Sequence, residues 1–116
     1  MQVLIAPDNI SSMLHAFGLR LLTKEGRHPA YDAFCNLRET CVITMENMKG
    51  IIGAETFKKV FAVENEMVFS YLIHNLKDFN YTLLCTSGQP HAVAQVLITY
   101  ILNSGAEIYY NGDMDP

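Results

Sequence analysis

The sequence predicts an α/β fold, and three features of its second half indicate it. Residues 58–116 follow the order strand, helix, strand, helix, strand. The connections are short, and the strand-like runs are mostly apolar, as expected of strands covered on both faces. We therefore expect a parallel sheet flanked by helices and joined by right-handed crossovers. The whole chain has 116 residues, 50% of them hydrophobic and 17% charged, which suits one compact domain.

The elements of the second half follow from periodicity and from turn residues. Helices are predicted where apolar side chains recur every three to four residues, and Gly105 ends the second helix. The predicted strands are residues 59–63, 81–86 and 106–110, and the predicted helices are residues 66–77 and 90–103.

The first half is less regular, and we expect residues 1–55 to form a smaller α/β segment that packs on a core of residues 56–116. Apolar residues at helical spacing follow two serines and predict a helix from Met13 to Leu22. Pro29 is suited to the first position of a second helix that reaches Arg38. The remaining predictions are short strands at residues 3–5 and 41–44 and a turn or short helix at residues 45–53.

Composition and charge exclude several classes of protein. Eight Lys and Arg against twelve Asp and Glu give a net charge of −4, which argues against nucleic-acid binding by these residues alone. No apolar run approaches the ~20 residues of a membrane helix, and the first residues are too short for a signal peptide. Cys35, Cys41 and Cys85 are odd in number and lack metal-ligand spacing, so we expect reduced thiols in a cytoplasmic protein.

Polar residues gather where the three parallel strands are predicted to end. Glu64 follows the first strand, the turn Ser87-Gly88-Gln89 follows the second, and Asp113 and Asp115 follow the third. Ligands of such sheets bind at the carboxyl ends of the strands. Two carboxylates two residues apart share a face of an extended segment and can bind one Mg²⁺, with Glu64 as a third acid. The alternative is a solvated acidic turn.

Two further alternatives stay open at this stage. Glu46 follows the strand at residues 41–44 and competes with Glu64, which we favour because it opens the regular strand–helix series. Ser87 can cap the following helix or help to bind an anion at its N-terminus. Tyr109 and Tyr110 are interpreted as packing residues, although a tyrosine near a metal could also act as a nucleophile. No phosphate-binding loop or dinucleotide fingerprint is present.

Three segments together resemble a known domain. They are VFAVEN at residues 60–65, LCTSGQP at residues 84–90 and GAEIYYNGDMDP at residues 105–116. This pattern resembles the Toprim domain, a Rossmann-like α/β fold of topoisomerases, primases and nucleases. Together the three segments resemble the Toprim-like C-terminal domain of an uncharacterised bacterial family related to JetD, the nuclease subunit of Wadjet plasmid-defence systems. That family is in turn similar to the topoisomerase VI A subunit.

The resemblance implies a function and a set of site residues. Glu64, Asp113 and Asp115 would be the acidic set that binds Mg²⁺ or Mn²⁺, and Ser87, Gly88 and Gln89 match a motif at the neighbouring strand end. The implied activity is metal-dependent phosphodiester cleavage of DNA, in plasmid defence and with an ATPase as complex partner. In that family a large DNA-binding part precedes the domain and a further helix follows it. We therefore expect the chain to be part of a longer protein and to be inactive alone.

A shared metal site requires a particular strand order. Carboxylates that bind one ion lie within a few Å of each other, so the first and third strands must be neighbours, in the local order 2-1-3. Two other functions remain open: a non-catalytic Toprim-like module that docks on an ATPase partner, and a Rossmann-like domain that binds a small ligand.

Overall fold

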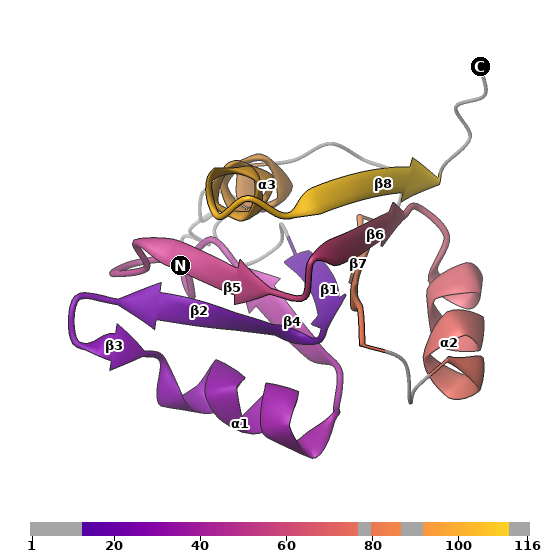
Figure 1. Ribbon diagram of the computed structural model, residues 1–116, viewed down its shortest axis with the longest axis horizontal. Coiled ribbons are helices and arrows are strands. Elements are labelled where there is room, and N and C mark those ends of the chain that lie inside the picture. Colours follow the sequence, from indigo (N-terminus) through magenta and orange to yellow (C-terminus); the bar gives the residue numbers. More distant parts are fainter. Residues whose placement is uncertain (1–12, 77–79, 87–91, 112–116) are drawn as a thin grey trace, which may run out of the picture.

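The computed structural model describes residues 13–76, 80–86 and 92–111, which form a mixed α/β fold (Figure 1). Eight strands and three helices lie within these residues. In chain order they are β1 (Met13–Phe17), β2 (Leu19–Thr23), β3 (Gly26–Arg27), α1 (Pro29–Leu37), β4 (Cys41–Thr44), β5 (Gly53–Thr56), β6 (Lys59–Val63), α2 (Glu66–Asn75), β7 (Thr82–Cys85), α3 (Ala92–Asn103) and β8 (Glu107–Asn111).

A five-stranded sheet in the order β4-β1-β7-β6-β8 forms the centre of the structure. Strand β6 pairs in parallel with β7 on one side and with β8 on the other, which confirms the predicted local order 2-1-3. Strand β1 pairs antiparallel with both β7 and β4. The sheet is therefore mixed, with three adjacent parallel strands, and the first half of the chain supplies two of its strands.

A smaller antiparallel sheet, in the order β3-β2-β5, lies beside the central one (Figure 1). Helix α1 packs on β2, where Arg20 forms an ion pair with Asp32 and donates a hydrogen bond of 3.0 Å to Asn36. Helix α3 contacts β5, and the hydroxyl of Tyr100 donates to the carbonyl of Ile51 at 3.1 Å. These contacts connect the small sheet to the helix that also covers the central sheet.

The helix predicted from Met13 to Leu22 is wrong, because this segment forms β1 and β2. Gly18 separates the two strands with a φ of +81°, a left-handed conformation that a continuous helix excludes. Leu14 and Ala16 alternate with residues of the other face of β1, as strand geometry requires. Strands β3 and β5 also have no counterpart in the sequence prediction, apart from Gly53, which was predicted to end a turn.

The other predicted helices and strands within the described residues are present, with bounds within about two residues of the predicted ones, whereas the turn predicted at residues 45–53 is shorter and its last residue, Gly53, belongs to β5. Strands β4 and β6 have the predicted bounds, and α1 starts at Pro29 with the His28 side chain accepting from the amide of Ala30. Residues 45–50 form a turn. The strand predicted at residues 3–5 and the predicted helix ends at residues 77 and 90–91 lie outside the described part of the chain.

The two faces of the central sheet are covered by different helices. On one face, Val60, Ala62 and Leu84 belong to a buried cluster that includes Val93 and Leu97 of α3. On the other face, the buried side chains come from β1, β6, β7 and α2; among them are Phe17, Val63, Phe69, Ile73, Leu83 and Cys85. This two-sided burial explains why β6 and β7 are mostly apolar, because all of β7 and three of the five residues of β6 are buried.

Candidate functional site

The three parallel strands end at the same level of the sheet. Val63, the last residue of β6, is in register with Cys85 of β7 and with Asn111 of β8. The amide of Thr86 donates to the carbonyl of Val63 at 2.9 Å and extends the pairing by one residue. Side chains that follow these strands therefore leave the sheet at one edge, where α/β proteins bind their ligands.

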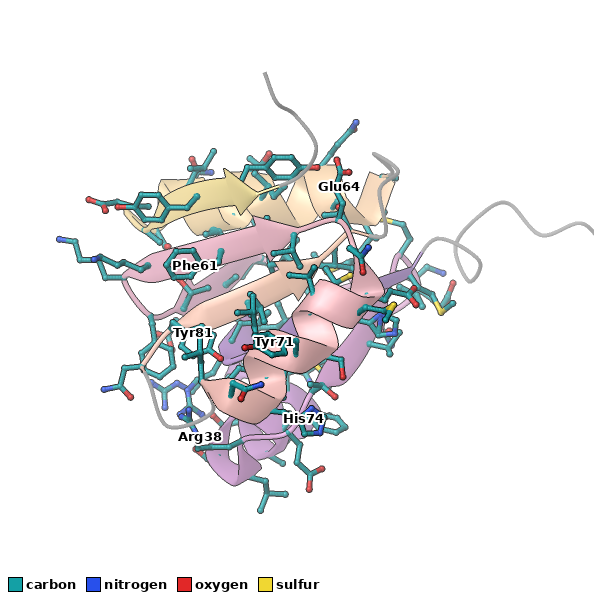
Figure 2. All side chains as sticks on the ribbon, turned by 90° about the vertical axis from the view of Figure 1, so that its right-hand side faces the viewer. Arg38, Phe61, Glu64, Tyr71, His74 and Tyr81 are labelled. Atoms are coloured by element: carbon teal, nitrogen blue, oxygen red, sulfur yellow. The ribbon has the colours of Figure 1, made fainter. Side chains whose placement is uncertain are left out.

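Glu64 lies at this edge, between the end of β6 and the start of α2 (Figure 2). The hydroxyl of Tyr110 on β8 donates a hydrogen bond of 2.6 Å to its Oε2 atom. The next residue, Asn65, is the N-cap of α2, so the backbone around Glu64 is held on both sides. The structure thus places the carboxylate of Glu64 against the strand that leads to Asp113 and Asp115.

The remaining predicted site residues lie outside the described residues. These are Asp113 and Asp115 after β8, and Ser87, Gly88 and Gln89 after β7. Strand β8 ends at Asn111, two positions before Asp113 in the sequence. Sharing of one metal by Glu64, Asp113 and Asp115 therefore stays a prediction, whereas the neighbouring position of β6 and β8 that it requires is confirmed.

Glu46, the alternative to Glu64, follows a strand that ends at the same edge but far from β8. Strand β1 is antiparallel to both β4 and β7, so β4 runs in the direction of β7. Three strand intervals separate β4 from β6, which at ~4.8 Å per interval amounts to about 14 Å. Glu46 also pairs with Lys49 at 3.0 Å. The strand order therefore favours Glu64 as the acid beside β8.

Both tyrosines of β8 are exposed, and the ring of Tyr109 also packs on Phe61, as its interpretation as a packing residue predicts. Tyr109 is 44% exposed and Tyr110 is 47% exposed within the described chain. The hydroxyl of Tyr109 donates to Glu107 at 2.8 Å, and this hydrogen bond, together with the charge of Glu107, raises the pKa of Tyr109. Each hydroxyl therefore contacts a glutamate, and only that of Tyr110 contacts Glu64. Sequence patterns carry no signal for this contact, because its partners are 46 residues apart.

Cysteine and histidine side chains offer no metal cluster in the described part of the chain. Cys35, Cys41 and Cys85 form no disulfide with one another. No group of three or more His, Cys, Asp or Glu side chains suited to a metal occurs among residues 13–76, 80–86 and 92–111. A metal site at the strand ends would therefore depend on the acids that follow Asn111.

An apolar groove of about 450 Å³ opens on the face of the sheet that α2 covers. Phe61 of β6 and Tyr81, both labelled in Figure 2, line the groove together with Leu72 of α2. Phe61 also stacks on Tyr109, with the ring centroids 5.3 Å apart. Among the described residues, those that line the groove carry no carboxylate, so they do not provide the ligands that a hard cation prefers.

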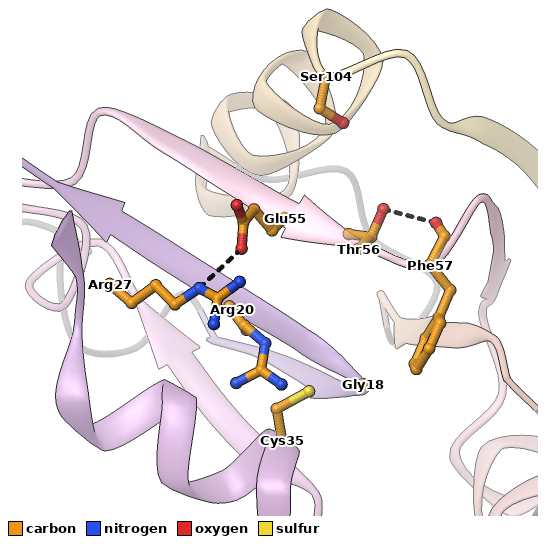
Figure 3. A pocket seen from close by; sticks show the side chains of 8 residues that line it. All are labelled: Gly18, Arg20, Arg27, Cys35, Glu55, Thr56, Phe57 and Ser104. Carbon is orange, nitrogen blue, oxygen red and sulfur yellow. Dashed lines mark hydrogen bonds and ion pairs between the residues drawn. The ribbon is translucent and has the colours of Figure 1, made fainter.

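A second hollow, of about 390 Å³, lies between the small sheet and the ends of α1 and α3 (Figure 3). Arg27 pairs across it with Glu55 at 3.0 Å, and Arg20 pairs with Asp32. Since both arginines already contact carboxylates, the hollow is less suited to an anionic ligand than two unpaired cations would be.

None of the helices within the described residues is long and apolar enough to cross a membrane.

Comparison with known protein families matched residues 37–116 to one family, which is described as "Protein of unknown function C-terminus (DUF2399)". The match runs from the end of α1 through all the strand ends described above. The search of curated proteins and the search of solved structures each found no match. Because the matched region spans most of its length, the chain belongs to the family of C-terminal domains named DUF2399.

Proposed function

We propose that this chain is the Toprim-like, metal-binding part of a DNA-cleaving protein that depends on Mg²⁺ or Mn²⁺. The observation that carries the proposal is the contact between Glu64 and β8, the strand that leads into Asp113 and Asp115. A glutamate after one parallel strand and a D-x-D after its neighbour, in the order 2-1-3, is the arrangement that the resemblance to the Toprim domain implies. The relationship to JetD belongs to the same proposal.

The chemistry of the proposed site fits a hard cation. Carboxylate oxygens are the protein ligands that Mg²⁺ prefers, and it keeps several waters when bound. The partly exposed carboxylate of Glu64 stands at the sheet edge and not in the core. A divalent ion there would stabilise the charge that develops on the phosphate and on the leaving oxygen during cleavage.

Each acid has a role in the proposal. Asp113 and Asp115 bind the ion. Glu64 either contributes to a second ion or transfers a proton as general acid or base, and both roles require it beside the D-x-D. DNA is held largely by residues outside this chain, because a net charge of −4 is unfavourable for phosphate contacts. The proposal also includes an ATPase partner, with which the longer protein would act in defence against plasmids.

Metal titration with matched variants tests this function. Isothermal titration of the 116-residue chain with Mg²⁺ and Mn²⁺ should show binding that Asp113→Asn and Asp115→Asn each weaken by about tenfold or more, since ligand charge determines affinity for such ions. Glu64→Gln should weaken binding in the same direction. Glu46→Gln is the control, because it removes a carboxylate at the same sheet edge, three strands away.

The second readout is cleavage by the longer protein in which this chain occurs. Plasmid nicking should require Mg²⁺ and should be lost in Glu64→Ala. A chain that binds no metal, or that loses as much affinity in Glu46→Gln as in Asp113→Asn, contradicts the proposal. That result favours a non-catalytic docking module.

A further inference from the structure

We infer that Tyr110 is a positioning residue, which holds the Glu64 carboxylate toward the end of β8 so that it can act together with Asp113 and Asp115. The inference rests on the proposed metal-dependent function. It assigns a role to the hydroxyl of Tyr110, which makes the described hydrogen bond to Glu64.

The register of the sheet explains why this tyrosine reaches this glutamate. Tyr110 is paired with Ala62 across β6 and β8, two residues before Glu64. Two residues of strand advance by about 6.6 Å, a distance that a tyrosine side chain can span along the sheet. The hydroxyl arrives at 2.6 Å from Oε2 of Glu64, a short hydrogen bond typical of a hydroxyl that donates to a carboxylate.

Glu64 needs such a partner because the neighbouring elements hold its backbone in place but leave its side chain unrestrained. It lies after the last residue of β6 and before the N-cap of α2, and its side chain is partly exposed. An exposed glutamate samples several rotamers, and ordering them costs conformational entropy when a ligand binds. A hydrogen bond from the neighbouring strand selects in advance the rotamers that point toward β8 and lowers that cost.

Two effects of the hydroxyl oppose each other. The hydroxyl donates a hydrogen bond to Oε2 and withdraws electron density from it, which weakens that oxygen as a metal ligand. It also orients the carboxylate, which strengthens metal binding. A carboxylate accepts several hydrogen bonds, so one donor leaves further acceptor sites. Hydrogen-bond partners that orient metal-ligating side chains typically contribute about 10- to 100-fold in affinity, so we expect orientation to dominate.

Tyr109 provides a matched control on the same strand. Its exposure of 44% is close to the 47% of Tyr110, and its hydroxyl also donates to a glutamate. That glutamate is Glu107, near the start of β8 and away from the strand ends. Tyr109→Phe and Tyr110→Phe therefore each remove one exposed hydroxyl and its hydrogen bond to a carboxylate. Only Tyr110→Phe removes a hydrogen bond to Glu64.

The experiment is a Mn²⁺ and Mg²⁺ titration of the 116-residue chain with these two variants. Tyr110→Phe should weaken metal binding by about tenfold, Tyr109→Phe should leave it unchanged, and both should unfold within a few degrees of the wild type. In the double variant Glu64→Gln/Tyr110→Phe, affinity should equal that of Glu64→Gln alone, since Tyr110 acts through Glu64. A purely structural role would instead lower affinity further.

The outcomes separate the two proposals. If Asp113→Asn abolishes binding but Tyr110→Phe binds as tightly as the wild type, the role of Tyr110 is overturned and the metal-dependent function stands. Additive losses in the double variant also overturn it. If the wild-type chain binds neither ion, both proposals fail.

Discussion

Gly18 joins β1 to β2 at a point where the chain passes close to β7. Its φ is +81°, and a Cβ at this position would lie 2.7 Å from the carbonyl oxygen of Tyr81. The fully buried Thr82 donates from its hydroxyl to the carbonyl of Gly18 at 2.6 Å and accepts from the amide of Phe57 at 3.1 Å. A glycine at this corner therefore allows the chain to pass from the central sheet to the small sheet.

Gly18→Ala should destabilise the fold more than Gly50→Ala does. Both residues have a φ of +81°, so both variants incur the cost of a left-handed alanine, about 1 kcal/mol. At Gly18 the added Cβ would also lie under 3.0 Å from the backbone oxygen of Tyr81, whereas a Cβ at Gly50 meets no atom within 4 Å. We expect a further loss of about 1–3 kcal/mol for Gly18→Ala, measured as the free energy of unfolding in urea. Equal losses in the two variants would show that the corner can relax.

Helix α2 begins two residues after Glu64, with Asn65 as its N-cap, so its first turn determines where that carboxylate leaves the sheet. The side chain of Asn65 accepts from the amides of Met67 and Val68, at 2.7 and 3.2 Å. These contacts satisfy two amides that have no partner within the helix. The cap thus connects the stability of α2 to the position of the candidate site residue.

Asn65→Ala should lower the free energy of unfolding by about 1 kcal/mol, since it removes the acceptor for both amides. Asn65→Asp should retain most of the stability, because aspartate caps equally well and its charge is favourable at a helix N-terminus. Urea unfolding followed by circular dichroism measures both variants. An alanine variant as stable as the aspartate variant would contradict the assigned cap.

Burial of ionisable groups makes the folded protein less stable relative to the unfolded chain at alkaline pH. Burial raises the pKa of the Cys41 thiol from 9.0 to about 12, with a smaller contribution from the charge of Cys35. Burial also raises the pKa of Tyr31 and of Tyr81. These groups ionise more easily in the unfolded chain than in the folded one, so the folded state loses relative stability as the pH rises.

For Cys41 the loss should begin near pH 9, where the unfolded thiol ionises, and continue toward pH 12. Its slope is at most about 1.4 kcal/mol per pH unit for one group. Urea unfolding at pH 8 and pH 10.5 should show a smaller decrease for Cys41→Ala than for the wild type, whatever the stability of the variant at pH 8. A decrease of the same size in both proteins would mean that Cys41 ionises while the protein is folded.

Local patterns were sufficient to predict β6, α2, β7, α3 and β8 and their parallel arrangement. Each of these elements has one clear periodicity, and connections this short leave few ways to join parallel strands. Residues 13–22 were misassigned because their apolar positions fit a helix as well as two strands. Pairing of β1 with β4 and β7, and of β2 with β5, decides between these conformations, and a local pattern contains none of those partners.

For the candidate site, too, the sequence predicts one part and long-range pairing decides the other. The order of residues along the chain is enough to place Glu64, Ser87 and Asp113 after three successive strands, because that placement depends only on where each strand ends. The sheet order, which places β6 and Glu64 beside β8 and places β4, the strand before Glu46, three strand positions from β6, follows from long-range pairing. The contact of Tyr110 with Glu64 follows from the register of β6 against β8, which no local sequence pattern encodes, because it arises only when the two strands pack together.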